Sequence, residues 1–501
     1  MTYLLGLDIG TSGAKAILCD SMGKVLASAR AEYPLSQPRP LWSEQSPADW
    51  WAGVRAALRE TVARAAVPVA QIVGLGLTGQ MHGAVFLDAQ DQVIRPAMLW
   101  NDQRTTEECA QITELVGAER LVAITGNPAL TGFQAPKILW LRRHEPDAYA
   151  RVARVLLPKD YIRLLLTGDY ATDASDAAGT LLLDLRARDY SPELLSAMEI
   201  SKTWLPQVYE GPQITGRLRV AVAEDLGLPA GLPVVAGGGD NAAAAVGTGV
   251  VRAGVVSSSI GTSGVLFAHS NTPALDPQGR LHGFCHAVPG QYHLMAVILS
   301  AGGAFQWLRN NLRTIAPGLS YDELTALAAI TPPGAEGLIF TPYLSGERTP
   351  HLDPLARAAF VGLTTRHGIG HMARAVMEGV VFALRDGLEI MRGLGVPIDE
   401  IRATGGGAKS PLWLQLQADI YGTPVATLAA EEGPAYGAAL LAGVGVGVFA
   451  DVAEAVDTCV RVAGVTAPNP ANGAVYAEAY AAYRTVYPAL GMVQSSVTVQ
   501  R

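Results

Sequence analysis

One short sequence, Ile-Gly-Thr-Ser-Gly, occurs twice in the chain, at residues 9–13 and 260–264. Each copy lies between two apolar runs, which predicts a β-hairpin with the glycines at its bend. Successive backbone N–H groups at such a turn can point into one concavity and bind a phosphate, with the Thr and Ser hydroxyls as further donors. Two such turns on facing lobes would hold a polyphosphate between them, although one copy alone is also explained by ordinary turn chemistry.

Two aspartates lie where they could act on such a phosphate. Asp8 ends the first predicted strand beside the first turn, where its carboxylate could be a ligand of Mg²⁺ or of a metal-bound water. The alternative for Asp8 is an Asx turn. Asp240 follows Gly237-Gly238-Gly239 and begins a helix, whose N-terminus favours the ionised carboxylate. It could accept the proton of a hydroxyl group during phosphoryl transfer, or it could be an ordinary helix N-cap.

Two further loops follow predicted strands, at the place where α/β sheets usually bind ligands. Met81 and His82 follow a strand over residues 73–77. His82 could hydrogen-bond a polyol while Met81 packs on its carbon atoms, or the histidine could be structural. Residues 405–410, Gly-Gly-Gly-Ala-Lys-Ser, resemble a Walker A loop but lack the glycine required before the lysine. We interpret them as a strand-to-helix turn, which either lets the backbone approach a ligand or is only a tight turn.

The elements that must position these residues alternate between strands and helices. Residues 3–33 predict three strands, and Ser46 with Asp49 predicts a capping box at the start of the first helix. The second half repeats this order, with a long helix starting near Gly370. The repeated turn recurs after about half of the 501 residues, which predicts a duplicated α/β unit rather than a solenoid. A terminal helix over 470–487 could pack on either lobe.

Composition and charge exclude several classes of protein. A chain of 501 residues, 49% of them hydrophobic, is too long for one ordinary core and predicts at least two domains. The net charge of −8 and the lack of Lys/Arg clusters argue against a nucleic-acid surface. Four scattered cysteines without a C-x-x-C pair predict neither a zinc site nor a disulfide framework. With no leader-like N-terminus and no apolar run of membrane-spanning length, we expect a soluble, cytoplasmic protein.

Taken together, these motifs resemble those of the FGGY carbohydrate kinases, which share the actin-like, ribonuclease-H-like ATPase fold. The resemblance covers nearly the whole chain, and the motifs occur in the expected order. The segments that carry it are residues 6–13, 79–83, 99–102, 158–161, 237–241, 259–264, 343–350 and 405–410.

The resemblance implies an α/β fold of two actin-like lobes with a ligand cleft between them. We place an N-terminal lobe, with the sugar site and the first phosphate turn, at residues 1–249. A C-terminal, nucleotide-binding lobe then covers residues 250–501. The family pattern also implies ATP and Mg²⁺ between the lobes, with the sugar deeper in the cleft against the first lobe.

The same resemblance assigns roles to individual residues. Asp240 is expected to be the catalytic base, and Asp8 the second catalytic carboxylate and the metal ligand. The expected sugar-binding residues are Met81, His82, Asp240 and Asn241. The expected nucleotide-binding residues are Thr11, Ser12, Gly261, Thr262, Gly303, Gly406 and Gly407. The polar loop over 343–351 is either an interlobe contact or part of the site.

Within the family, the sequence is most similar to members that transfer the γ-phosphoryl group of ATP to the 5-hydroxyl of D-xylulose, a step of pentose catabolism. The expected products are D-xylulose 5-phosphate and ADP. A related ketose, polyol or aldonate is the alternative acceptor, because a few pocket residues decide specificity. A non-catalytic actin-like module that binds ATP or a sugar is the alternative from a different class. The expected partners are the sugar and ATP, with no nucleic acid and no membrane, and a second copy of the chain is a candidate for a homodimer.

Overall fold

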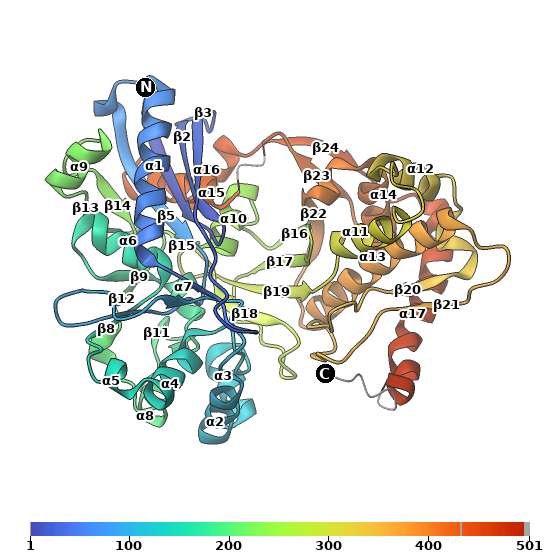
Figure 1. Cartoon of the computed structure of the whole chain (residues 1–501). Coiled ribbons are helices and arrows are strands. Elements are labelled where there is room, and N and C mark those ends of the chain that lie inside the picture. The colour runs from blue at the N-terminus through green and yellow to red at the C-terminus, as the bar shows by residue number, and fades with distance from the viewer. Residues whose placement is uncertain (1, 431–432, 495–501) are drawn as a thin grey trace.

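The computed structural model describes residues 2–430 and 433–494, which form two lobes built on two large sheets (Figure 1). The first sheet contains β1 (Tyr3–Ile9), β2 (Gly13–Asp20), β3 (Val25–Glu32), β5 (Ile72–Gly79), β13 (Ile214–Arg217), β14 (Pro233–Val235) and β15 (Gly238–Gly239). The second sheet contains β16 (Gly254–Ile260), β17 (Gly264–Ser270), β18 (His282–Cys285), β19 (Tyr292–Ile298), β22 (Ile398–Gly405), β23 (Val425–Leu428) and β24 (Val462–Thr466).

The two sheets share one strand order and one set of strand directions. The first runs β3-β2-β1-β5-β14-β13, with β1 antiparallel to β2 and parallel to β5. The second runs β19-β17-β16-β22-β23-β24, with β16 antiparallel to β17 and parallel to β22, and β18 is added beyond β19. This repeated topology confirms the predicted two-lobed α/β fold. The two Gly-Thr-Ser turns join β1 to β2 and β16 to β17, so they occupy equivalent places.

The equivalence of the lobes extends to the loops that follow the next strand. Ile9 pairs with Gly79 at the end of β5, and Ile260 pairs with Gly405 at the end of β22. The loop with Met81 and His82 in the first lobe therefore corresponds to the glycine-rich loop after β22 in the second. The fold thus places one potential ligand loop beside the Gly-Thr-Ser turn of each lobe.

Helices cover the sheets and fill the long insertions between their strands (Figure 1). Those of the first half are α1 (Pro47–Ala65), α2 (Thr106–Val116), α3 (Ala118–Thr125), α4 (Gln134–His144), α5 (Pro146–Tyr149), α6 (Pro158–Thr167), α7 (Ala174–Ala178), α8 (Pro192–Ala197), α9 (Val220–Leu226) and α10 (Asp240–Thr248). Those of the second half are α11 (Gly302–Leu312), α12 (Tyr321–Ala329), α13 (Ile369–Gly393), α14 (Pro411–Tyr421), α15 (Pro434–Gly445), α16 (Val452–Cys459) and α17 (Gly473–Gln494). No helix within residues 2–430 and 433–494 has the length and apolar character needed to cross a bilayer.

Short strands pair outside the two large sheets. They are β4 (Glu44–Gln45), β6 (Val85–Leu87), β7 (Ala97–Met98), β8 (Arg154–Leu156), β9 (Ala171–Asp173), β10 (Leu183–Asp184), β11 (Asp189–Tyr190), β12 (Gln207–Tyr209), β20 (Ile339–Thr341) and β21 (Ala359–Val361). The predicted capping box of α1 is wrong, because the Ser46 side chain makes no cap hydrogen bond. The Ser46 backbone carbonyl instead accepts a hydrogen bond from the Asp49 N–H, at 3.0 Å.

Two helices from the second half of the sequence pack on the first lobe. α15 lies against β1, β5 and α10, and α16 lies beside it (Figure 1). Apolar side chains of α15, such as Leu440, share one core with Leu4 of β1 and Val246 of α10. The helix fits so closely that a Cβ on Gly6 would lie 1.8 Å from the Ala435 carbonyl oxygen. The boundary between the lobes at residues 249/250 stays a prediction. The chain returns to the first lobe at α15.

The C-terminal helix α17 packs on the second lobe, against β20, α13 and α14. Its Tyr483 is buried and shares a hydrogen bond of 2.8 Å with the hydroxyl of Tyr343. The helix whose place the sequence left open therefore belongs to the second lobe.

Candidate active site

Two cavities share the turn between β16 and β17. Gly261 and Thr262 line the larger cavity, of about 720 Å³, and Ser263 lines the smaller one, of about 210 Å³. Residues of both lobes line the smaller cavity, and the second lobe forms the larger one. A group bound at this turn would therefore face both cavities, which is the arrangement that transfer between two ligands requires.

The smaller cavity brings together the residues that the sequence assigned to a sugar. Met81 and His82 come from the loop after β5, and Asp240 and Asn241 from the first turn of α10. Its other lining residues are Trp100, Leu130, Gly132, Phe133, Ser263, Val265, His282, Phe284, Met295, Val297 and Arg348. Aromatic and aliphatic walls with a few polar groups are typical of small-molecule sites.

Asp240 is positioned as the first residue of α10, after Gly239 as the N-cap. The N-cap role that was the alternative for Asp240 therefore belongs to its neighbour. Its Oδ1 accepts hydrogen bonds from the backbone N–H of Asn241, at 2.7 Å, and from the Asn241 side chain, at 2.9 Å. Both bonds fall on Oδ1, which leaves Oδ2 to accept a proton. Desolvation raises the pKa of the Asp240 carboxyl to about 6, although the Asn241 hydrogen bonds oppose the rise.

His82 is held as a neutral imidazole. Its Nδ1 donates a hydrogen bond of 2.8 Å to the Gly179 carbonyl, because a carbonyl oxygen can only accept. Desolvation lowers the pKa of the ring to about 3. Nε2 is then an acceptor, suited to the hydroxyl group of a polyol. The residue adopts a left-handed backbone with φ of 69°, which is uncommon outside glycine and fixes the direction of the side chain.

Asp8 lies in β1, paired with Lys15 on β2 and Thr78 on β5. Its Oδ1 is buried and accepts no hydrogen bond from the residues that the structure describes, so the geometry does not support an Asx turn. Desolvation raises the pKa of Asp8 to about 7, and the negative charge of Asp240 adds to the rise. A cation near both carboxyl groups would favour their ionised forms.

The first Gly-Thr-Ser turn has its carbonyl groups bound by the protein. The Tyr33 hydroxyl donates to the Gly10 carbonyl at 2.5 Å, and the Gln45 amide donates to the Thr11 carbonyl at 2.6 Å. In residues 2–430 and 433–494, nothing accepts a hydrogen bond from the N–H groups of Thr11 and Ser12. Carbonyl oxygens that would repel an anion are thus occupied, while two N–H donors stay available.

The second turn is built in the same way but with backbone partners. The Gly302 N–H donates to the Gly261 carbonyl at 2.8 Å, and the Gly303 N–H donates to the Thr262 carbonyl at 3.0 Å. The contact is close, since a Cβ on Gly303 would lie 2.9 Å from the Thr262 carbonyl oxygen. The start of α11 thereby fixes the turn, and Gly303 lines the larger cavity.

The larger cavity has the glycine-rich loop after β22 as another wall. Gly406 and Gly407, both predicted to approach a nucleotide, line it together with Gly261, Thr262 and Gly303. Its remaining lining residues are Ile260, Gly302, Phe305, Gln306, Tyr321, Asp322, Thr325, Ala326, Ala329, Lys409, Ser410, Pro411, Leu412 and Trp413. Its volume of about 720 Å³ is in the range of sites for nucleotide-sized ligands.

The predicted phosphate residues Thr11 and Ser12 line neither cavity. Thr11 is nevertheless tied to the smaller cavity, because its hydroxyl accepts a 2.9 Å hydrogen bond from the indole of the lining residue Trp100. Thr11 also donates to Gln80, the residue before Met81, at 3.3 Å. The first turn therefore lies next to the smaller cavity, on the first-lobe side.

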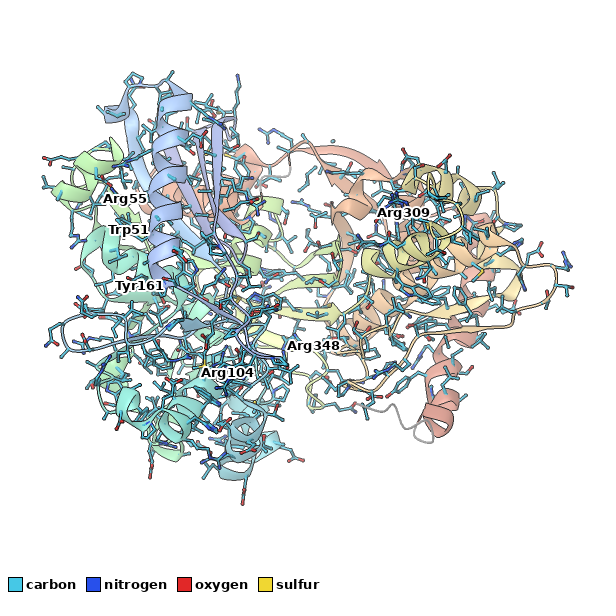
Figure 2. The ribbon with its side chains drawn as sticks, viewed as in Figure 1. Trp51, Arg55, Arg104, Tyr161, Arg309 and Arg348 are labelled. Atoms are coloured by element: carbon cyan, nitrogen blue, oxygen red, sulfur yellow. The ribbon has the colours of Figure 1, made fainter. Side chains whose placement is uncertain are left out.

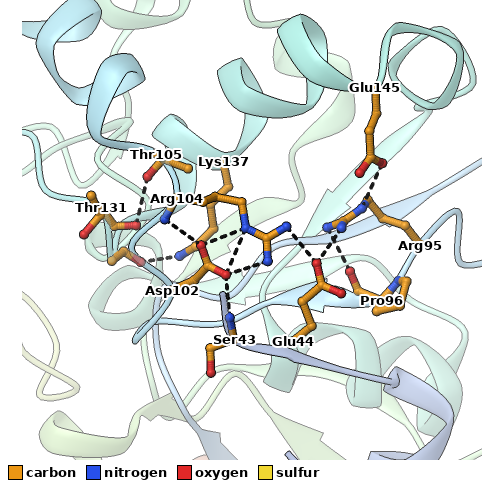
Figure 3. Close-up of polar contacts among 11 residues, drawn as sticks. Ser43, Glu44, Arg95, Pro96, Asp102, Arg104, Thr105, Thr131, Lys137 and Glu145 are labelled. Carbon is orange, nitrogen blue, oxygen red and sulfur yellow. Dashed lines mark hydrogen bonds and ion pairs between the residues drawn. The ribbon is translucent and has the colours of Figure 1, made fainter. Parts of the chain in front are cut away.

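A buried polar network supports the loops that form the first-lobe wall of the smaller cavity (Figure 3). Asp102 accepts hydrogen bonds of 2.6–3.0 Å from the guanidinium of Arg104. The buried Lys137 donates to the carbonyl of His82, at 2.9 Å, and to that of Gly132. These bonds hold two loops whose residues line the cavity.

The loop over 343–351 contributes Arg348 to the smaller cavity, from the second lobe. Figure 2 shows Arg348 where the two lobes meet. Its guanidinium lies 3.5 Å from Nε2 of His282, and the adjacent buried Glu347 accepts a hydrogen bond from the Leu299 N–H at 2.9 Å. The loop whose role the sequence left open is therefore part of the cavity wall, and these two contacts lie within the second lobe.

Sequence reasoning missed the aromatic wall of the smaller cavity. The rings of His82 and Phe133 meet edge to face at 4.8 Å, and Phe284 stacks on His282 at 5.9 Å between centroids. His82 was predicted, but Phe133 and the pair His282 and Phe284 lie on separate segments with ordinary apolar neighbours and carried no signal beyond that of core residues.

Comparison with known protein families identifies the class to which this protein belongs. The chain matches the N-terminal domain of the FGGY family of carbohydrate kinases over residues 3–247 and the C-terminal domain over residues 256–446. It belongs to this family, and it is therefore a phosphotransferase.

Individual relatives are more specific. The chain is 46% identical to the xylulose kinase of Escherichia coli over 440 residues, which cover 87% of this chain and 89% of that protein. A solved xyloylose kinase from Brucella ovis is 41% identical, with a TM-score of 0.91 and coverage of 98% and 100%. A gluconate kinase from Lactobacillus acidophilus is 27% identical, with a TM-score of 0.93 and coverage of 99% and 100%.

Proposed function

We propose that this enzyme transfers the γ-phosphoryl group of ATP to the 5-hydroxyl of D-xylulose, giving D-xylulose 5-phosphate and ADP. The observation that carries the proposal is the turn over residues 261–263, which borders both the smaller and the larger cavity. ATP would occupy the larger cavity with its phosphates at this turn. The sugar would occupy the smaller cavity beside Asp240. The xylulose kinase relatives support D-xylulose as the acceptor.

Asp240 acts in this proposal as the general base. Oδ2 accepts the proton of the sugar hydroxyl as that oxygen attacks the γ-phosphorus, and the bond to the β,γ-bridging oxygen of ATP breaks. The N–H groups of the two turns hold the phosphate oxygens. Nε2 of His82 accepts a hydrogen bond from the sugar, and Met81 packs against its carbon atoms.

Asp8 is the residue that would hold Mg²⁺. Its buried Oδ1 accepts no hydrogen bond from the described residues, and a cation would satisfy it. When bound there, Mg²⁺ would neutralise negative charge on the phosphates. Asp8 itself then keeps its carboxylate ionised beside Asp240.

A panel of acceptors tests the proposal. ADP release is measured with ATP and D-xylulose, D-ribulose, gluconate or glycerol, and phosphorus NMR locates the phosphate on the product. We expect the highest kcat/KM with D-xylulose and a phosphate on its 5-oxygen. If another acceptor gave a higher kcat/KM, that acceptor would be the substrate instead of D-xylulose. The similarity to a gluconate kinase makes gluconate the strongest alternative acceptor. ADP release that is absent or independent of any acceptor would favour the non-catalytic module.

The activity should decrease when the pH falls below neutrality. A base must be ionised to accept a proton, and burial raises the pKa of Asp240 to about 6, whereas bound Mg²⁺ would keep Asp8 ionised. We expect kcat/KM for the sugar to decrease as the pH falls from about 7 to about 5. His82, with a pKa lowered to about 3, stays neutral throughout. A kcat/KM that is flat down to about pH 5, in protein whose melting temperature is unchanged, would contradict this expectation.

Arg348 should contribute to sugar binding rather than to nucleotide binding. Arg348→Met removes the charged donor from the smaller cavity, and hydrogen bonds to charged groups contribute about 1.5–3 kcal/mol. We expect KM for the sugar to rise about 10- to 100-fold, while KM for ATP changes less than about twofold. Steady-state kinetics with each substrate varied measures both. Arg313→Met, at an exposed arginine that donates to the Pro317 carbonyl, is the control. An unchanged KM for the sugar would remove Arg348 from the binding site.

A further inference from the structure

A buried charged cluster lies outside both cavities and takes no part in the proposed reaction. Nζ of Lys159 lies 2.5 Å from Asp160, 3.0 Å from Asp173 and 3.6 Å from Asp176. The exposed fraction of all four side chains is 1% or less. Such an arrangement costs desolvation free energy and is weak evidence for stability, so its place in the fold needs another reason.

One chain of hydrogen bonds leads from this cluster to the residue before Asp240. Oδ1 of Asp173 accepts a hydrogen bond from the Ser175 hydroxyl, at 2.5 Å. Oγ of Ser175 in turn accepts one from the backbone N–H of Gly239, at 3.0 Å. The Ser175 hydroxyl is thus both donor and acceptor, and its direction is set by the carboxylate behind it.

A second contact leads from the same helix to the strand before Asp240. Arg163 follows Lys159 by one turn of α6, so both side chains leave the same face of the helix. Its guanidinium donates to the carbonyls of Val235, at 2.5 Å, and Ala236, at 2.8 Å. Helix α6 and the cluster therefore hold the segment 235–239 at both of its ends.

The segment also pairs with β5 through Gly238 and Gly239. The backbone N–H groups of Ala236 and Gly237 donate to the carbonyls of Gln213 and Gly211, at 2.8 Å each. The segment contains Gly237, Gly238 and Gly239, which have no side chains to pack. Side chains are excluded here, since a Cβ on Gly237 would lie 1.8 Å from the Leu77 carbonyl oxygen. Its position, and with it that of Asp240, depends on backbone hydrogen bonds.

The charges in the cluster favour this arrangement. Burial would lower the pKa of the Lys159 ammonium, but the three carboxylates outweigh it and raise the pKa above its usual range. Burial raises the pKa of Asp176 well above its ordinary value. Asp176 can therefore carry a proton, while Lys159 stays charged and Asp173 keeps its contact with Ser175.

We propose that Lys159, Asp173 and Ser175 are positioning residues, which fix the Gly239 N–H and thereby place the Asp240 carboxylate against the sugar hydroxyl. Arg163 acts with them on the preceding strand end. The proposal rests on the proposed function, in which Asp240 is the base. None of these residues touches the reacting atoms, so their removal should lower kcat and leave the binding of both substrates intact.

Ser175→Ala tests this positioning role in the full-length enzyme, because it breaks the chain of hydrogen bonds between Asp173 and Gly239. We expect kcat to fall about 10- to 100-fold, with both KM values within about twofold of wild type. The control is Ser258→Ala, since Ser258 is also fully buried and donates a 2.8 Å hydrogen bond, to Gln417 in the second lobe. The melting temperature should decrease by a similar amount in both variants, but Ser258→Ala should keep the kcat of the wild type. A folded Ser175→Ala enzyme with kcat within about twofold of wild type would overturn the proposal, as would an equal loss of kcat in the control.

Asp173→Asn provides a second variant in case Ser175→Ala does not fold. Asparagine keeps an acceptor for the Ser175 hydroxyl and for the α7 cap but removes the charge that faces Lys159. We expect a smaller loss of kcat, about 3- to 30-fold, again at unchanged KM. An unchanged kcat here would also overturn the proposal. Asp240→Ala, measured alongside, distinguishes the failure of the two proposals. If this variant keeps kcat, Asp240 is not the base. If this variant loses kcat but Ser175→Ala and Asp173→Asn do not, Asp240 remains the base and only the positioning role fails.

Discussion

Asp240→Asn should lower kcat by about 10²–10⁴-fold while ATP and the sugar still bind, because general-base catalysis contributes an effect of that size. Asparagine has the same shape and can still accept the Asn241 hydrogen bonds at Oδ1, but it cannot accept a proton. Calorimetric titration of both substrates and steady-state kinetics measure the two parts of this expectation.

A matched substitution separates the chemistry of Asp240 from the mere removal of a charge. Asp88→Asn changes an aspartate of the same lobe whose Oδ1 also accepts two hydrogen bonds, here from the backbone N–H groups of Gln90 and Gln92, at 2.9 Å each. This residue lines neither cavity, so kcat should stay within about twofold of wild type. Turnover of Asp240→Asn within about tenfold of wild type would show that another group accepts the proton.

The sequence predicted the fold well because the repeated features are local. The Gly-Thr-Ser turns and their flanking apolar runs determine two hairpins without reference to the rest of the chain. The equivalence of the two sheets then follows from the duplication. By contrast, the place of α15 depends on tertiary packing. Its apolar run from Pro434 predicts burial, but only the structure shows that it is buried in the other lobe, against β1 and β5.

The site was predictable to the extent that its residues belong to glycine-rich motifs. Asp240 and His82 follow strands at short loops, where chemistry and spacing are visible in the chain. Arg348 lies in a loop whose place the sequence left open, because residues of both lobes form the cavity that it lines. Lys159 belongs to the 158–161 motif, but nothing in the sequence indicated its contacts, and Ser175 carried no signal. The chain of hydrogen bonds exists only when α6, α7 and the strand before Asp240 meet in space.

The helix that begins with Asp240 depends on a second contact, with α15. These two helices follow equivalent strands of the two lobes and pack on each other. Their approach is close enough that a Cβ on Gly437 would lie 1.8 Å from the Ala243 carbonyl oxygen and 2.9 Å from the Gly247 nitrogen. Residues 240 and 243 lie one helical turn apart, so a displacement of α10 at this contact also displaces the base.

Gly437→Ala should therefore damage both stability and catalysis. Overpacking of this kind costs about 3 kcal/mol, which exceeds the gain of about 1 kcal/mol that alanine brings to a helix. We expect a clear decrease in the denaturation midpoint and, in the folded fraction, a loss of kcat of about tenfold, from the displaced Asp240. Thermal and urea denaturation together with kinetics of the purified enzyme measure both effects.

The same substitution at Gly393 provides the opposite expectation. Gly393 ends α13, and a Cβ there meets no atom within 4 Å, so alanine should leave stability and kcat unchanged or raise stability slightly. If Gly437→Ala behaved like Gly393→Ala, the two helices would tolerate separation, and the position of Asp240 would not depend on α15. If it lowered stability but left kcat intact, the helix contact would be structural, and the Gly239 segment alone would place the base.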